Sequence, residues 1–174
     1  HRICYRAIAY GTNQRTIIAT ILPKNVFYGH SLNADVSIIH YKNQLVVLAL
    51  LNSFCVDYLI RSMIGANLTK NFFYQLPVPR LSSGDAYYEE LLERSARLVC
   101  TSDEFADLWS EVYPGRKQEP VPTAPERLRM RAEMDAMVAK IYDLTVEEFD
   151  YVLSTFPSAD KEHKRLARDI FAGL

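Results

Sequence analysis

Residues 42–64 read KNQLVVLALLNSFCVDYLIRSMI, and they decide the fold because they separate a strand-like sequence from a helical one. The stretch contains no Gly or Pro, and apolar residues such as Leu45, Leu48 and Val56 recur at helical intervals. It predicts one buried helix, or two helices joined near Asn52 and Ser53. Its longest apolar run is far shorter than the roughly 20 residues that cross a membrane, so no membrane contact is expected.

The sequence before this stretch favours strands. Residues 2–9 and 16–22 are rich in apolar and β-branched side chains, and residues 10–15 between them contain the turn formers Gly and Asn. They predict two strands that pair as a hairpin. Residues 26–32 and 34–40 predict two shorter strands on either side of a turn.

Residues 67–79, NLTKNFFYQLPVP, combine adjacent aromatics with amides and a lysine. We expect a loop that enters a short edge strand over residues 72–78, where the prolines exclude a central position in a sheet. Phe72 and Phe73 would anchor this segment in the core and hold Lys70 and Asn71 at a fixed place on the surface. Asn71, like Asn67, has the alternative of merely capping backbone groups.

The remainder of the chain predicts helices, beginning with an amphipathic one through residues 91–99. Residues Thr101 and Glu104 have the spacing of a capping box for the next helix, and Thr145 with Glu148 has it for a later one. Further expectations are a proline-rich strap over residues 114–125, a helix through residues 128–141 and a last helix over roughly residues 161–171.

These patterns together predict an α+β fold, in which a small mixed or antiparallel β unit with a buried helix precedes an α-helical C-terminal unit. The expected parts are an α/β part at 1–82, a helical connector with its strap at 83–123, and a helical unit at 124–174. A chain that lacks an initiator Met is also expected to be a piece of a longer protein.

The charge is distributed unevenly along the chain. Residues 1–82 hold eight Lys and Arg against two acidic residues, whereas residues 83–174 hold twelve against nineteen. This split suggests two units with different partners, although a solvated basic surface is the plain alternative. The three widely spaced cysteines indicate reduced core thiols. The histidines do not have the spacing of a metal site, so no metal is expected.

Sequence signatures of catalysis are missing. The chain contains no GxGxxG, no P-loop and no GxSxG, and no Asn/Asp-Pro-Pro-aromatic tetrapeptide of an amino-methyltransferase. It also lacks a PD…ExK arrangement for metal-dependent cleavage of a phosphodiester. We therefore expect that the chain is not an enzyme on its own, holds no cofactor and takes no small-molecule substrate.

Three blocks in order carry a family resemblance: YRAIAYGTNQRTIIATILP at 5–23, LLNSFCVDYLIRSMIGANLTKNFFYQLPVP at 50–79 and RAEMDAMVAKIYDLTVEEFDYVLSTFP at 131–157. Together they resemble the C-terminal target-recognition region of type IIG and TaqI-like restriction–modification N6-adenine DNA methyltransferases. Type I specificity subunits have related recognition domains.

The resemblance implies a sequence-specific DNA recognition domain that acts in phage defence, in the cytoplasm of a prokaryote. The chain would hold double-stranded DNA while a catalytic domain elsewhere in the parent protein binds S-adenosylmethionine and receives the flipped adenine. Residues 1–82 would then be the DNA-binding target-recognition part and residues 124–174 the docking unit. The partners would be DNA and the parent's own methyltransferase or nuclease domains. The alternative is a protein–protein interaction module that docks a methyltransferase or nuclease subunit.

Candidate DNA contacts follow from residue chemistry. Arg15 lies in the predicted turn with Asn13, and arginine and asparagine make the usual bidentate contacts to guanine and adenine. Arg15 has two alternatives, binding a phosphate or bracing the fold. The candidate set is Arg6, Asn13, Arg15, Lys24, Asn25, Lys70 and Asn71. Of these, Arg6, Lys24 and Asn25 are weaker candidates, as are Arg2 and His30 outside the set.

Overall fold

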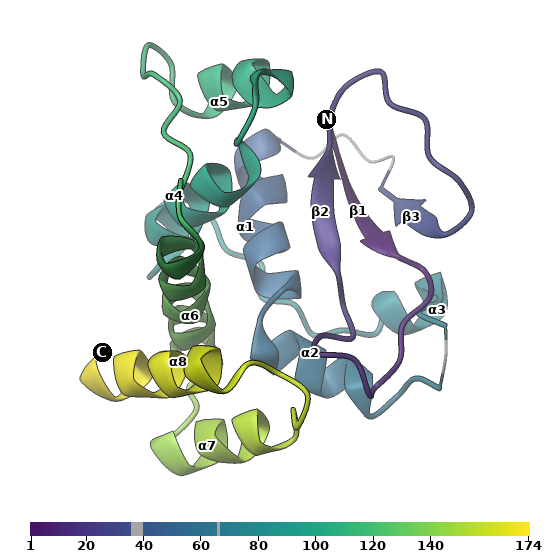
Figure 1. Ribbon diagram of the computed structural model, residues 1–174, viewed down its shortest axis with the longest axis vertical. Helices are drawn as coiled ribbons and strands as arrows, with labels where there is room; N and C mark the ends of the chain where they lie inside the picture. Colours follow the sequence, from purple (N-terminus) through teal and green to yellow (C-terminus); the bar gives the residue numbers. More distant parts are fainter. Residues whose placement is uncertain (36–39, 66) are drawn as a thin grey trace.

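A computed structural model describes residues 1–35, 40–65 and 67–174 of the 174-residue chain. Within these residues a three-stranded antiparallel sheet lies beside eight α-helices, as Figure 1 shows. The predicted α+β fold is confirmed.

The sheet has the order β2-β1-β3, with β1 (Arg2–Arg6) between β2 (Ala19–Leu22) and β3 (Leu32–Ala34). The predicted hairpin of β1 and β2 is confirmed, although its connection spans residues 7–18 and is longer than the predicted turn. Both β2 and β3 are antiparallel to β1, so they run parallel to each other, and the connection from β2 to β3 crosses to the other side of β1.

The strand predicted over residues 26–32 and the turn after it are wrong. The chain turns earlier, where the Leu32 amide donates to the Gly29 carbonyl at 3.1 Å, so Asn33 lies inside β3 instead of in a turn. This placement lets β3 pair with the free edge of β1. Residues 36–39, most of the second strand predicted there, lie outside the described residues.

Residues 42–64 lie in two helices and the turn after them, α1 (Tyr41–Leu51) and α2 (Phe54–Arg61), in agreement with the two-helix alternative. The break follows from two polar residues. The Ser53 hydroxyl caps α2 by accepting from the Val56 amide, and the Asn52 side chain bonds both the Leu48 carbonyl and β2.

No single helix within the described residues is long and apolar enough to span a membrane. Only α1 and α2 together meet that test, and they are bent by 62° to each other.

The edge strand predicted over residues 72–78 is wrong, because α3 (Lys70–Phe73) occupies the start of this segment. The Phe73 amide donates to the Thr69 carbonyl at 3.1 Å, which closes a helical turn. The turn brings the Phe73 ring onto Tyr5 of β1, with ring centroids 4.4 Å apart and planes 3° from parallel. Both phenylalanines pack against the core, so their predicted anchoring role is confirmed.

The later helices agree with the predicted pattern. They are α4 (Tyr88–Val99), the 3₁₀ helix η1 (Asp103–Phe105), α5 (Ala106–Val112), α6 (Ala124–Ile141), α7 (Val146–Ser154) and α8 (Lys161–Gly173). The capping box of Thr145 and Glu148 is confirmed at the start of α7.

The capping box predicted at Thr101 is wrong. Ser102 precedes η1 and makes no side-chain cap, and α5 begins only after that 3₁₀ turn. A second capping box that was not predicted, formed by Thr123 and Glu126, begins α6 at the end of the proline-rich strap.

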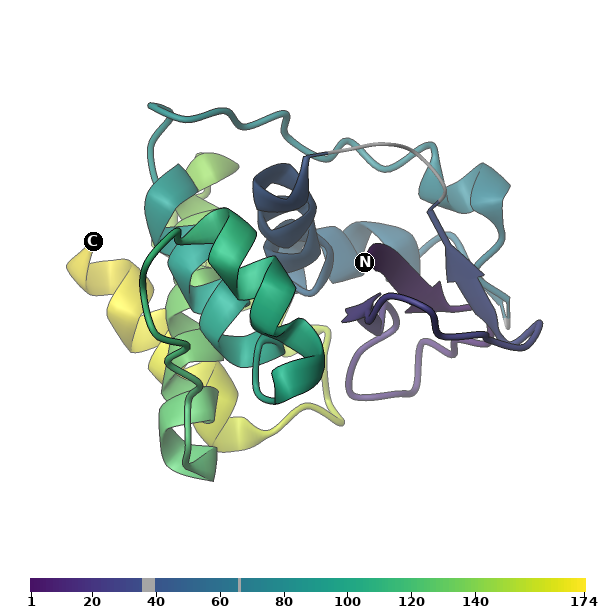
Figure 2. The same cartoon turned by 90° about the horizontal axis from the view of Figure 1, so that it is seen from above.

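The elements stack in layers, which Figures 1 and 2 show from two directions. Helix α1 packs between the β1–β2 pair and α4, while α6 packs along α8. One hydrophobic cluster runs through these layers, from Ile21 of β2 through Leu45 and Leu92 to Phe171 of α8. The three cysteines are free and buried, as expected.

Candidate functional site

One side of the molecule carries several of the predicted contact residues, on β1 and α3 (Figure 1). Arg6 at the end of β1 is exposed, as are Lys70 and Asn71 at the start of α3. A β-bridge between Ile8 and Asn67 joins the two segments that carry them. The structure therefore places Arg6 near the entry to α3, although the two lie 64 positions apart in the sequence.

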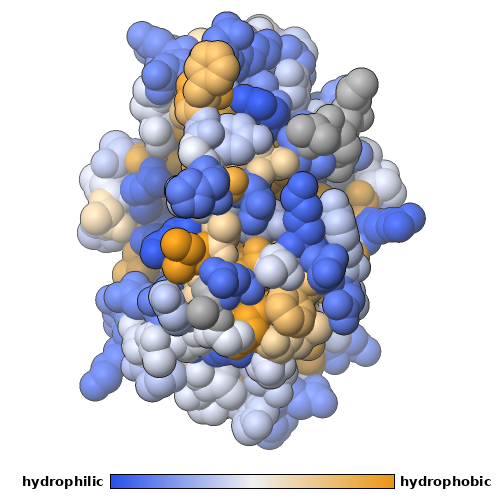
Figure 3. Space-filling view, turned by 90° about the vertical axis from the view of Figure 1, so that its right-hand side faces the viewer, coloured by the Kyte–Doolittle hydropathy of each residue, from blue (hydrophilic) through white to orange (hydrophobic). Residues whose placement is uncertain are grey.

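The same side includes the loop of residues 23–31, which exposes aromatic rings. Phe27 is fully exposed (100%) and Tyr74, just after α3, is 79% exposed. Figure 3 looks onto this side and shows hydrophilic residues around a few hydrophobic ones. We call this surface the basic face, defined by Arg6, Asn25, Phe27, Lys70, Asn71 and Tyr74.

The segments that form the basic face contain no acidic residue. Asp and Glu are missing from residues 1–34 and from residues 67–84. Among the described residues, Arg6 and Lys70 make no ion pair. Their charges therefore remain available to an anionic partner.

Lys24 differs from these two cations because α5 already neutralises it. Its Nζ lies 2.5 Å from Asp107 Oδ2 and 3.8 Å from Glu111 Oε1. The hydrogen bond from Lys24 is the main reason why the pKa of the Asp107 carboxyl is below its usual value. Asn25 follows with a φ of 61°, in the left-handed region that asparagine tolerates, and shapes the loop.

Arg15 points into the protein. Its Nη2 donates to Asp135 Oδ2 of α6 at 2.9 Å, and its guanidinium lies 3.3 Å from the centroid of the Phe54 ring. Only 18% of the side chain is exposed. Asn13, two residues earlier, has its carbonyl bound by Arg61 Nη2 at 2.7 Å. This geometry favours the bracing role of Arg15 over base reading.

The buried carboxylate of Asp135 contacts three groups in the interior. Its Oδ1 accepts from the Phe54 amide at 2.7 Å, and its Oδ2 lies 2.9 Å from Arg15 Nη2 and 2.8 Å from His163 Nε2. Burial alone would raise the pKa of the Asp135 carboxyl, but these partners outweigh burial and hold its pKa below the usual value. The site thus contains a buried, ionised carboxylate that links α2, α6 and α8.

Asp57 and Arg61 of α2 make a second set of interior bonds. Both carboxylate oxygens of Asp57 accept from the Thr16 amide, at 3.0 and 2.8 Å. Burial raises the pKa of the Asp57 carboxyl, and these hydrogen bonds oppose the rise. The Arg61 guanidinium donates to Thr16 Oγ1 at 3.2 Å and to the Thr155 carbonyl at 3.3 Å.

These bonds connect the three sequence blocks that carry the family resemblance. Arg15 of the first block binds Asp135 of the third, and Asp57 of the second binds the first. Arg61 of the second block binds both the first block and Thr155 of the third. The polar positions of the blocks therefore hold the sheet against the C-terminal helices, across the boundaries expected at residues 82 and 123.

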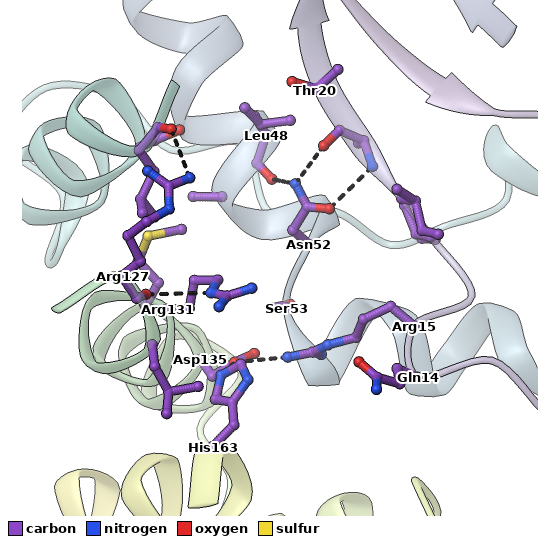
Figure 4. A pocket seen from close by; sticks show the side chains of 18 of the residues that line it. Gln14, Arg15, Thr20, Leu48, Asn52, Ser53, Arg127, Arg131, Asp135 and His163 are labelled. Atoms are coloured by element: carbon purple, nitrogen blue, oxygen red, sulfur yellow. Dashed lines mark hydrogen bonds and ion pairs between the residues drawn. The ribbon is translucent and has the colours of Figure 1, made fainter. Parts of the chain in front are cut away.

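A cavity of about 490 Å³ opens beside this cluster (Figure 4). Its walls come from β2 and the residues before it, from α1, α4 and α6, and from the start of α8. Arg127 and Arg131 of α6 line it together with Arg15 and His163. Neither arginine of α6 was among the predicted site residues.

Comparison with known proteins found no match to this chain among family models, curated proteins or solved structures. One signal in the sequence pointed to part of the site: Asp57 and Arg61 are charged residues in an otherwise buried apolar stretch, and such residues need internal partners.

Proposed function

We propose that the chain is the DNA sequence-recognition region of a restriction–modification adenine-N6 DNA methyltransferase. The observation that carries the proposal is the basic face, where exposed cations and exposed aromatic rings stand on segments without a single acidic residue. Cations contact the phosphates of a duplex and supply most of the salt-dependent affinity. Exposed aromatic rings suit contact with bases.

The interior bonds give further support. Family blocks that lie far apart in sequence meet through Arg15, Asp57 and Arg61, which accounts for their occurrence as an ordered set. The same bonds fix the sheet on a rigid helical base. A rigid base is what a recognition surface needs to hold DNA in register while a base is flipped.

In this proposal the chain performs no catalysis itself. The parent protein would bind S-adenosylmethionine and methylate the adenine in a separate catalytic domain, against which the acidic helical half would dock. Such an enzyme acts in the cytoplasm of a prokaryotic cell as a defence against phage. Double-stranded DNA and the parent's methyltransferase or nuclease domains are the proposed partners.

Charge reversal on the basic face tests the proposal. We expect Arg6→Glu and Lys70→Glu each to weaken binding of a fluorescently labelled duplex, measured by anisotropy, because each replaces a phosphate-binding cation with an anion. The matched control is Arg129→Glu, since Arg129 is exposed on α6, away from the sheet. Equal binding by all three variants and the unmodified chain would favour the protein-interaction alternative.

A further inference from the structure

The cavity beside the Arg15–Asp135 pair has the size of a small-molecule site. Its volume of about 490 Å³ lies within the range of roughly 300 to 1,000 Å³ typical of ligand pockets. Its position, between β2 on one side and α6 and α8 on the other, is the junction of the sheet and the C-terminal helices (Figure 4).

Three guanidinium groups line this cavity. Arg127 and Arg131 come from successive turns of α6, and Arg15 reaches in from the opposite wall, as Figure 4 shows. Within the described residues, neither Arg127 nor Arg131 forms an ion pair. Arg127 donates to the Leu98 carbonyl and Arg131 to the Arg127 carbonyl, each at 3.3 Å. The Nη1 of Arg15 is buried and makes no hydrogen bond with the described residues.

The acidic residues of the lining are already engaged. Asp135 is bound by Arg15, His163 and the Phe54 amide, and Asp160 caps α8 by accepting from the His163 amide at 2.8 Å. These two carboxylates do not balance three guanidinium groups. Although Arg131 is exposed, partial desolvation lowers its pKa and repulsion from Arg127 and Arg15 lowers it further, while attraction to Asp135 and Asp160 opposes the fall without cancelling it. A bound anion would relieve this crowding of cations.

The rest of the lining mixes apolar and polar side chains. Ile17, Leu48, Leu98, Leu128 and Met134 are apolar, whereas Gln14, Thr20, Asn52, Ser53 and Ser95 are polar. A cationic end beside apolar side chains suits a ligand that has an anionic group attached to a flat or apolar part.

We propose that this cavity binds a phosphate group carried on an organic body, with a mononucleotide as the model ligand. The phosphate is held by Arg127 and Arg131, and the body lies against Leu48 and Leu98. Arginine suits this role because its planar fork donates two parallel hydrogen bonds to phosphate oxygens. The inference is independent of the proposed DNA function, because none of these residues belongs to the basic face.

Isothermal titration calorimetry at fixed ionic strength tests the site with adenosine 5′-monophosphate, adenosine and inorganic phosphate. We expect the monophosphate to bind at least tenfold more tightly than adenosine, because adenosine lacks the charged group. Equal affinity for the two, or no heat from the monophosphate at millimolar concentration, would overturn the proposal. This comparison uses the unmodified chain and does not depend on any variant folding.

Three variants locate the site. Arg127→Ala and Arg131→Ala should each weaken monophosphate binding about tenfold, while Arg129→Ala on the same helix, outside this cavity, should leave it unchanged. Unaltered binding by both cavity variants, with melting temperatures like that of the unmodified chain, would contradict the assignment.

Two kinds of ligand carry such a phosphate, a free phosphate monoester and the backbone of DNA. Competition with a short duplex separates them. Displacement of the monophosphate by DNA, with loss of DNA binding in Arg131→Ala, identifies a backbone phosphate as the occupant. Simultaneous binding of both identifies a free small molecule.

Discussion

Replacement of Arg15 by methionine tests whether this residue braces the fold. Methionine keeps the length and apolar character of the side chain but removes the guanidinium, which binds Asp135 Oδ2 at 2.9 Å and covers the Phe54 ring at 3.3 Å. The change therefore leaves a buried carboxylate without its strongest cation and removes a desolvated cation–π contact.

The expected loss follows from these contacts. Breaking a buried ion pair costs about 3–5 kcal/mol, and a desolvated cation–π contact contributes about 2 kcal/mol. Asp135 retains the Phe54 amide and His163, which offset part of the loss. We expect the free energy of unfolding to fall by about 3 kcal/mol, equivalent to roughly 6–12 °C in melting temperature for a chain of this size.

Urea denaturation followed by circular dichroism measures this loss, with Arg129→Met as the matched control. Arg129 is a surface arginine of α6 whose side chain is 75% exposed, so its replacement should change stability by less than about 0.5 kcal/mol. A double-mutant cycle with Asp135→Asn should give a coupling of at least about 1.5 kcal/mol.

The opposite result would refute the bracing role. If Arg15→Met unfolds at the same urea concentration as the unmodified chain but loses DNA affinity, Arg15 faces the DNA and does not contact Asp135 and Phe54 in the interior.

Three further predictions concern stability and reactivity. Thr145→Ala should lower the free energy of unfolding by about 1 kcal/mol, because it removes the cap that accepts from the Glu148 amide, and Thr145→Ser should restore it. Burial raises the pKa of the Cys55 and Cys100 thiols to about 12, so a disulfide reagent at pH 8 should modify them only after unfolding. The pKa of Asp135 is below its usual value because its partners outweigh burial, so its contribution is complete above the unfolded pKa of about 3.9 and is lost as the pH falls below it. Urea titrations from pH 6 to pH 3 should therefore show a steeper loss of stability in the unmodified chain than in Asp135→Asn.

Features fixed by neighbouring residues were predictable from the sequence. The break near Asn52 and Ser53 follows from two polar side chains that bond nearby backbone groups, and the capping box at Thr145 needs only residues three positions apart. The pairing of β1 with β2 likewise followed from two apolar runs around a turn-rich segment.

Features fixed by distant residues were not predictable. Residues 72–78 have a strand-like composition, but the stacking of Phe73 on Tyr5, 68 positions away, accompanies a helical turn there. The partner of Arg15 lies 120 positions away on α6. Nothing local distinguishes an arginine that binds DNA from one that binds a buried carboxylate, so the role of Arg15 stayed open until the fold was known.

The salt dependence of binding tests most directly whether the basic face binds duplex DNA. Anisotropy of a labelled duplex, titrated with the chain between about 50 and 200 mM salt, should show an affinity that falls steeply with salt, with a slope of about −0.9 per phosphate contact. Lys70→Gln should make this slope shallower by about one unit. No binding at the lowest salt, or binding whose slope is unchanged in Lys70→Gln and in Arg6→Gln, would show that the basic face does not bind DNA.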